Sequence, residues 1–417
     1  MHVMKSMFQR KPPILSLRPE FHSQCSLTNP QVVCNSSSTR EEFMMKILDR
    51  RWTLKNPDTK VHQINVSSLQ TQPTSKLLGN VSFSNNSHPS LGENLMEWHN
   101  DQSSFYIVRD DLLHPLVNGN KARKLDALLP LIEDHLGTDV AIWDSASDVL
   151  KFNYTIFIGH MWRLPKCTYC SCCCFLCRER IKGTFTFTEE MLTSHADSIS
   201  GTVIPLDDLH LLKDSFTNHK STKSNLNQPS NSKKIVIINE GAGDAIAMPG
   251  LIRLVKYLSQ DHILGKNQPL KIVVDSGTGT TAIGLGIGAL CLGLPWEITS
   301  VMLADTIEGY RKHEEHLISE LCGSSGFPFV MHSGLVHWVE REHPRKFGNV
   351  LKGEIEACQQ IAKETGVLVD PIYTLAAWEL ASQLSQQEKK GGAKVVMLHT
   401  GGTLGMFGLA QRYKSYF

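Results

Sequence analysis

The fold of this chain is decided by one segment, KIVVDSGTGTT, residues 271–281. Ile272 to Val274 are three consecutive β-branched residues, which is typical of a strand buried on both faces. A turn with two glycines follows, and a helix rich in Ala, Gly and Leu is predicted from there to Leu292. The glycines let successive backbone N–H groups turn inward, and the threonine hydroxyls add further donors. This strand–turn–helix unit therefore predicts a nest for an anion such as a phosphate.

The turn differs from two common phosphate-binding loops. No lysine closes it, so a P-loop with Mg²⁺ is not indicated. Its glycines lack the G-x-G-x-x-G spacing of dinucleotide-binding folds, although Asp305 ends the next predicted strand where a ribose-binding acid would lie. A monophosphate is the better match for residues 277–281. A dinucleotide site and a purely structural turn are the alternatives.

Strands and helices alternate through the second half of the chain. This alternation predicts an α/β fold, with a mostly parallel sheet that helices cover on both faces. Ligands of such sheets bind at the carboxyl ends of the strands, where three glycine-rich loops would converge. The predicted strands are 235–238, 271–275, 296–304, 367–369 and 395–398, the predicted helices include 351–362 and 374–384, and the loops are 239–243, 276–281 and 399–403.

A second candidate functional stretch is NGNKARK, residues 118–124. Its asparagines and glycine tolerate positive φ, so the chain can turn sharply before a helix that starts at Lys121. Arg123 and Lys124 are expected to crowd Lys121 with positive charge, which favours the neutral amine that attacks an aldehyde to form a Schiff base. Taken alone, the motif is more typical of a helix start with solvated cations.

The composition narrows the classes of function. Lys and Arg number 42 against 41 Asp and Glu, so the net charge of +1 does not indicate nucleic-acid binding. No run of about 18 apolar residues occurs, so no membrane span is predicted. The length of 417 residues suits two domains with a sizeable core.

The first forty residues are basic and rich in serine, and Glu20 is their one acid. Such a composition is typical of an organellar transit peptide, which we place at residues 1–45, and equally of a disordered tail. Residues 46–97 are expected to form an extended N-terminal arm, because Asp58 to Ser90 is rich in Ser, Asn and Pro and has little periodicity.

An aldehyde-reactive lysine, a phosphate nest and an α/β sheet are together typical of pyridoxal 5'-phosphate enzymes. The motifs that identify the kind of enzyme are RDD at 109–111, GNKARKL at 119–125, EGAG at 240–243, GTGTT at 277–281, DPIYT at 370–374 and HTGG at 399–402. With these motifs the chain resembles the D-cysteine desulfhydrase and 1-aminocyclopropane-1-carboxylate deaminase family. That family has the tryptophan-synthase-β-like fold, fold type II. The resemblance implies an α/β architecture of two open, mostly parallel sheets with helices on both faces.

The resemblance also implies roles for individual residues. Lys121 would be the Schiff-base lysine and the acid/base that moves the Cα proton, and Tyr373 would be a second catalytic residue beside the substrate. Thr374 would face the pyridine nitrogen of the cofactor. The cofactor-binding residues would be Asn120, Lys121, Lys124, Gly277, Thr278, Gly279, Thr280, Thr281, Thr374 and Thr400. No metal site is expected.

Thr374 favours one of the family's two reactions. The deaminases place a glutamate at this position, and the desulfhydrases place a threonine. A hydroxyl is compatible with an unprotonated ring, a weaker electron sink that still suffices to remove a proton and expel a β-thiolate. The resemblance therefore implies a lyase that converts D-cysteine to sulfide, pyruvate and ammonia. The alternatives are a 1-aminocyclopropane-1-carboxylate deaminase and an isoform that binds the cofactor but is catalytically impaired.

Residues 141–187 depart from the family pattern. Relatives have a glycine-rich turn and a catalytic Ser/Asn there, whereas no helix or strand pattern runs through the latter part of this segment. Six of the 11 cysteines lie in 167–177, as two C-x-x-C pairs that only three residues separate, against roughly 15 in zinc ribbons. We therefore predict an aberrant, mis-spliced or intron-derived segment instead of a metal site. Phe347 also stands where relatives carry a tyrosine, which removes a hydroxyl near the substrate.

The expected domain organisation follows from these assignments. Residues 98–125 and 233–417 would form the large pyridoxal-phosphate-binding domain, and residues 126–231 the small domain. The expected partner is a small amino-acid substrate, without nucleic acid or membrane, in a homodimer. The expected location is the mitochondrion if residues 1–45 are a transit peptide, and otherwise the cytoplasm.

Overall fold

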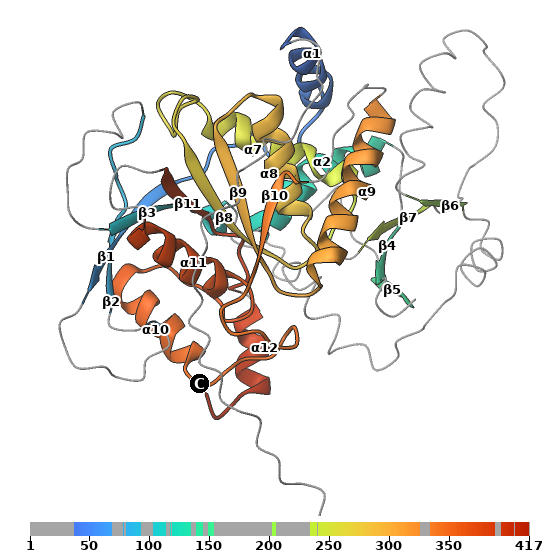
Figure 1. Cartoon of the computed structure of the whole chain (residues 1–417). Helices are drawn as coiled ribbons and strands as arrows, with labels where there is room; N and C mark the ends of the chain where they lie inside the picture. Colours follow the sequence, from blue (N-terminus) through green and yellow to red (C-terminus); the bar gives the residue numbers. More distant parts are fainter. Residues whose placement is uncertain are drawn as a thin grey trace, which may run out of the picture.

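The structure, a computed structural model, describes residues 37–68, 78, 81–92, 103–113, 117, 119–134, 139–144, 149–153, 202–205, 234–239, 241–325, 334–387, 393–403 and 405–416. Its strands form a seven-stranded sheet and a four-stranded sheet (Figure 1). The cysteine-rich stretch 167–177 and most of the segment 141–187 lie outside the described residues, as do Asn118 and Glu240.

The larger sheet is mostly parallel, as the sequence predicts. Its first five strands in spatial order pair in parallel, and β1 and β2 complete the far edge in antiparallel pairing. Both antiparallel strands lie within the segment 46–97, where the sequence predicts an arm. The spatial order is β10 (Val336–Glu340), β9 (Trp296–Met302), β8 (Leu270–Ser276), β11 (Lys394–Leu398), β3 (Ser103–Val108), β1 (Val61–Ser68) and β2 (Val81–Asn86).

Side chains of the central strands alternate between two hydrophobic cores, one on each face of the larger sheet. In β8, Ile272 and Val274 pack in the first core and Val273 packs in the second. Helices cover both faces, as Figure 1 shows. The first core contains side chains of α1 (Ser37–Leu48), α7 (Pro249–Leu258), α8 (Thr280–Cys291) and α9 (Ile307–Ser325), and the second contains those of α10 (Glu354–Thr365) and α11 (Thr374–Gln387).

The prediction of a strand at 367–369 is wrong. This stretch has no regular secondary structure and joins neither sheet. Leu368 is 58% exposed, and its carbonyl oxygen bonds to Nε2 of His399 at 2.9 Å instead of to a neighbouring strand. Val367 and Val369 nevertheless pack in the second core. The two valines therefore reflect burial in a core instead of membership of a strand. The outer parallel strand is β10, which the sequence did not reveal.

The smaller sheet contains β5 (Val149–Asn153), β4 (Asp139–Asp144), β7 (Lys234–Asn239) and β6 (Thr202–Pro205), in that spatial order. β4 and β6 pair in parallel with β7, and β5 pairs antiparallel with β4. The predicted strand at 235–238 is present as β7, although it belongs to this sheet and not to the larger one. No helix among the described residues is long and apolar enough to span a membrane.

Candidate active site

Lys121 lies in the first turn of α2 (Gly119–Asp134), where this helix meets the loop after β11. Gly119 begins the helix with a φ of +63°, and a Cβ there would lie 1.9 Å from the carbonyl oxygen of Thr400. Only glycine fits this approach. The backbone N–H of Asn120 donates to the same oxygen at 3.1 Å. The helix start that carries Lys121 is therefore fixed against the carboxyl end of β11.

Lys121 and Lys124 converge on one carbonyl oxygen. Nζ of Lys121 donates to the oxygen of Gly241 at 3.2 Å, and Nζ of Lys124 donates to it at 2.9 Å. Gly241 has a φ of +70°, and a Cβ there would lie 3.3 Å from Lys121 Nζ and 3.3 Å from Cγ2 of Thr278. The lysine amine, the turn after β7 and the threonine turn after β8 thus meet in one place.

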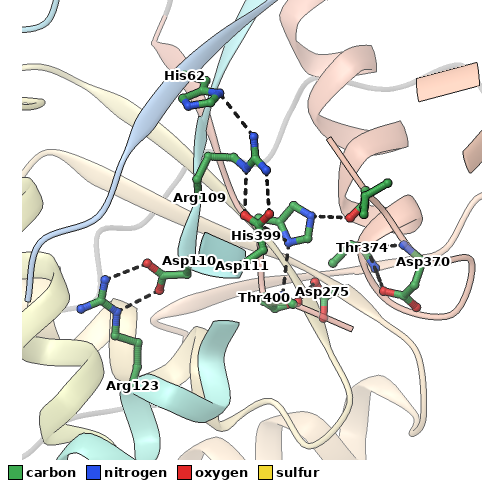
Figure 2. A network of polar contacts seen from close by, with 12 residues as sticks. His62, Arg109, Asp110, Asp111, Arg123, Asp275, Asp370, Thr374, His399 and Thr400 are labelled. Atoms are coloured by element: carbon green, nitrogen blue, oxygen red, sulfur yellow. Dashed lines mark hydrogen bonds and ion pairs between the residues drawn. The ribbon is translucent and has the colours of Figure 1, made fainter. Parts of the chain in front are cut away.

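The two cations that follow Lys121 have different surroundings. Lys124 is buried, and burial lowers its pKa well below the ordinary value, with the charge of Lys121 lowering it further. Arg123 is buried as well, but its guanidinium donates to both carboxylate oxygens of Asp110 at 2.9 and 2.7 Å (Figure 2). The expectation that Arg123 crowds Lys121 is wrong, because its charge is paired with Asp110.

The turn at Gly277 to Thr281 has the form of an anion nest. Gly279 has a φ of +90° and occupies the N-cap position of α8, without a side-chain hydrogen bond to cap the helix. A Cβ there would lie 3.0 Å from Trp338 and 3.1 Å from Tyr310. The Tyr310 hydroxyl is 2.7 Å from the carbonyl oxygens of both Ser276 and Gly277. The first N–H groups of α8 are therefore uncapped by a side chain, and contacts with Tyr310 and Trp338 position the turn before them.

Hydroxyl groups surround this turn. Thr281 Oγ1 accepts from Nδ2 of Asn120 at 3.0 Å, and the hydroxyls of Thr278 and Thr280 are 3.1 Å apart. Thr280 also lies 3.4 Å from Nε2 of His313, a residue that sequence analysis did not single out. Burial, together with the charges of His316 and Lys124, lowers the pKa of His313 to about 4. His313 is therefore neutral at neutral pH.

The DPIYT motif forms a compact turn that leads into α11. Oδ1 of Asp370 accepts from the N–H groups of Ile372 and Tyr373 at 3.0 and 2.9 Å. Thr374 is fully buried, and its Oγ1 lies 2.8 Å from Asp370 Oδ2. A Cβ on Gly277 would lie 3.5 Å from the Tyr373 ring. The turn therefore brings Tyr373 against the threonine turn and keeps Thr374 on Asp370.

Thr400 links the end of β11 to a buried carboxyl group at the end of β8. Its Oγ1 donates to Oδ1 of Asp275 at 2.6 Å. This pair lies beside a similar threonine–aspartate pair, Thr374 and Asp370 (Figure 2). Burial raises the pKa of Asp275 to about 7. The Thr400 hydrogen bond opposes this shift, and the charge of Asp370 adds to it. Asp275 therefore titrates near neutral pH, close to the site.

The RDD and HTGG motifs support the site from one side. Arg109 donates to both oxygens of Asp111 at 2.8 and 2.7 Å, and its Nη1 lies 3.3 Å from Nδ1 of His62 (Figure 2). Nδ1 of His399 accepts from the N–H of Gly401 at 3.2 Å, so its Nε2 carries the proton and donates to Leu368. These contacts hold the loop that contains Thr400.

The structure brings most of the predicted site residues together. Contacts at Gly241 and at the loops 276–281 and 399–403 link six of them: Asn120, Lys121, Lys124, Thr278, Thr281 and Thr400. Tyr373 reaches this group at Gly277. Thr374 lies behind Tyr373 on Asp370. Sequence analysis did not single out Tyr310 or His313, because their spacing in α9 is ordinary. Within the described residues, no group of three His, Cys, Asp or Glu side chains is placed to hold a metal ion.

Comparison with known proteins identifies the family. No family model matches the chain. It is 40% identical over 397 residues to "Putative D-cysteine desulfhydrase 2, mitochondrial" of Oryza sativa subsp. japonica, an alignment that covers 88% of this chain and 93% of the relative.

Two more distant relatives have names from the same group. A "Putative 1-aminocyclopropane-1-carboxylate deaminase" of Pyrococcus horikoshii is 25% identical, over 72% of this chain and 85% of the relative. The "Bifunctional D-cysteine desulfhydrase/1-aminocyclopropane-1-carboxylate deaminase, mitochondrial" of Arabidopsis thaliana is 22% identical, over 73% of this chain and 74% of the relative. At 40% identity to the rice protein over most of both sequences, this chain belongs to the D-cysteine desulfhydrase and 1-aminocyclopropane-1-carboxylate deaminase family.

Proposed function

We propose that this protein is a pyridoxal 5'-phosphate-dependent lyase that catalyses β-elimination of D-cysteine to sulfide, pyruvate and ammonia. The observation that carries the proposal is the meeting of the Lys121 amine with the threonine turn at Gly241. Family membership supports the class of enzyme. The most extensive of the three alignments is to a relative named as a D-cysteine desulfhydrase, which supports the reaction.

The residues present fit the cofactor. An aldehyde requires an amine, which Lys121 supplies, and a phosphate requires donors, which the start of α8 supplies. Thr281 accepts from Asn120 and so keeps its own proton for a ligand. When bound, the cofactor supplies an electron sink for the negative charge that develops when the substrate Cα loses its proton.

Lys121 is the residue that would hold and move this proton. The Gly241 carbonyl oxygen orients its amine, and Lys124 shares that oxygen. Burial lowers the pKa of Lys124 well below its ordinary value, which weakens the positive charge beside Lys121.

Tyr373 would lie beside the substrate. Its ring packs edge-on against Phe347, with 5.6 Å between the ring centroids, and lies next to Gly277. This aromatic pair would exclude water from the reacting atoms, and the Tyr373 hydroxyl is the second candidate acid/base group.

Product analysis tests the reaction. Purified protein supplied with pyridoxal phosphate is expected to release sulfide and pyruvate in equal amounts from D-cysteine, and Lys121→Ala is expected to abolish both. Release of 2-oxobutanoate from 1-aminocyclopropane-1-carboxylate, without sulfide from D-cysteine, would contradict the proposal in favour of the deaminase. A protein that binds the cofactor and forms neither product would be the impaired isoform.

Location and assembly are part of the same proposal. The rice and Arabidopsis relatives are both named as mitochondrial, which supports a mitochondrial location over the cytoplasm. The N-terminal residues 1–36, which would contain most of a transit peptide, lie outside the described part of the chain. The two sheets support a large and a small domain, and the homodimer remains an expectation.

A further inference from the structure

Glu354, the first residue of α10, collects contacts from the whole of the loop 341–353 that joins β10 to this helix. Its side chain is 1% exposed. Oε1 accepts from Nη2 of Arg341 at 2.9 Å and from Nη2 of Arg345, and Oε2 accepts from the N–H of Leu351 at 2.7 Å. Among the described residues, neither guanidinium donates to another carboxylate. One buried carboxylate therefore holds both ends of this loop.

Arg341 connects the carboxylate to the turn that carries Tyr373. Its Nη1 donates to the carbonyl oxygen of Ile372 at 3.2 Å, and its Nη2 donates to that of Pro371 at 2.9 Å. These two residues directly precede Tyr373 in the chain. The turn is therefore held through its N–H groups by Asp370 and through its carbonyl groups by Arg341.

Arg345 connects the same carboxylate to Phe347, two residues further along the loop. Its Nη1 also donates to the carbonyl oxygen of His343 at 2.9 Å, which fixes the backbone before Phe347. The Phe347 ring meets the Tyr373 ring edge-on, at an angle of 73° between the ring planes. Because Phe347 is 42% exposed, contacts made by its loop must supply much of what keeps the ring in place.

The two guanidiniums thus reach the two sides of one aromatic contact from a single carboxylate. We propose that Glu354 is a positioning residue of the active site, which holds Phe347 against Tyr373. This inference rests on the proposed function, in which Tyr373 lies beside the substrate. A fixed contact orients the tyrosine hydroxyl and keeps water from the reacting atoms. Loss of the carboxylate leaves two largely buried cations without their shared partner, so both sides of the contact are expected to shift.

Glu379 of α11 provides a matched control for the charge of Glu354. Burial raises the pKa of Glu379 to about 7, the charges of Arg341 and Arg345 oppose this shift, and the charge of Glu354 adds to it. Glu379 therefore shares the electrostatic field of the cluster, whereas both guanidiniums donate to Glu354. Above about pH 8, where Glu379 is ionised, Glu379→Gln removes one negative charge and leaves these hydrogen bonds intact.

Fluorine NMR of the full chain labelled with 3-fluorotyrosine tests the positioning role at this pH. The chain has 8 tyrosines, so the Tyr373 signal is assigned as the one that Tyr373→Phe removes. Phe347→Leu marks the chemical shift that Tyr373 takes without its aromatic neighbour. Glu354→Gln is expected to move the signal toward that shift, because an amide has one acceptor oxygen and cannot serve three donors. Glu379→Gln is expected to leave the signal in place.

Arg345→Gln is the second variant, because it removes the link to the loop and leaves Arg341 paired with the buried carboxylate. It is expected to move the Tyr373 signal in the same direction as Glu354→Gln. In the full chain supplied with pyridoxal phosphate, both variants are expected to lower kcat/KM for D-cysteine about 10- to 100-fold, whereas Glu379→Gln keeps it.

Three results decide between the outcomes. An unchanged Tyr373 signal in Glu354→Gln and Arg345→Gln would overturn the positioning role. An equal displacement of the signal in Glu379→Gln would overturn it too, because a change of charge alone would then suffice. Signals that move as expected, in a protein whose wild type releases no sulfide from D-cysteine, would support the positioning of the aromatic pair and contradict the proposed function instead.

Discussion

At the scale of single residues, the site contains carboxyl groups whose partners are hydroxyls instead of cations. Asp275 is 3% exposed, and burial raises its pKa to about 7. The folded-state pKa lies above the unfolded value, so the stability that the neutral carboxyl preserves is lost as the pH rises through that range. As the pH rises from about 4 to 7, Asp275→Asn is therefore expected to gain stability relative to the wild type, by a few kcal/mol at most.

Urea unfolding of both proteins across this range measures the gain. The comparison cancels Glu379, whose pKa burial also raises to about 7, because both proteins contain it. A stability difference that stays constant with pH would contradict the buried, uncompensated state of Asp275.

The sequence predicted Lys121 and the threonine turn through their motifs. It did not predict the state of Asp275, because burial depends on neighbours from β11 that are distant in sequence.

At the scale of elements, the turn between β8 and α8 depends on Tyr310 of α9. The Tyr310 hydroxyl contacts the carbonyl oxygens of Ser276 and Gly277 and accepts from the N–H groups of Leu303 and Ala304 at 3.3 and 3.1 Å. Tyr310→Phe leaves these groups without that partner. The variant is expected to lose about 1–3 kcal/mol of stability and to bind the cofactor more weakly, as urea unfolding and cofactor titration would show.

Tyr257→Phe is the control for this variant, because the Tyr257 hydroxyl donates to one carbonyl oxygen, that of Thr59, at 3.3 Å. Equal effects of the two substitutions on cofactor binding would show that Tyr310 has no special role in the turn.

The sequence predicted β8, its turn and α8 because buried parallel strands have a strong apolar signal. It predicted a strand at 367–369 wrongly and did not predict β10, since a short apolar run does not reveal its pairing partner.

At the scale of the whole molecule, the N-terminal helix is part of the fold. Phe43, Met44 and Ile47 of α1 are 0, 6 and 3% exposed and pack in the first core. The transit-peptide boundary expected at residue 45 would cut this helix. A chain that lacks residues 1–48 is therefore expected to be less stable than one that lacks residues 1–36, by about 1.5–3 kcal/mol per buried side chain.

Thermal unfolding of the two truncated proteins, beside the full chain, measures this difference. Equal stability of both truncations would contradict a structural role for α1. The sequence predicted the α/β class and a mostly parallel sheet from its second half. It could not place α1, β1 and β2, because their mixed, polar sequences become core and edge elements only through contact with the rest of the chain.

The central claim is that Lys121 carries the cofactor. The most direct test is to reduce the protein bound to pyridoxal phosphate with borohydride and to map the labelled peptide by mass spectrometry. Lys121 and Lys124 share the carbonyl oxygen of Gly241, so the experiment must resolve one amine from the other. The reduced cofactor is expected on Lys121 alone. A label on Lys124 or on any other lysine, or no label at all, would contradict the claim.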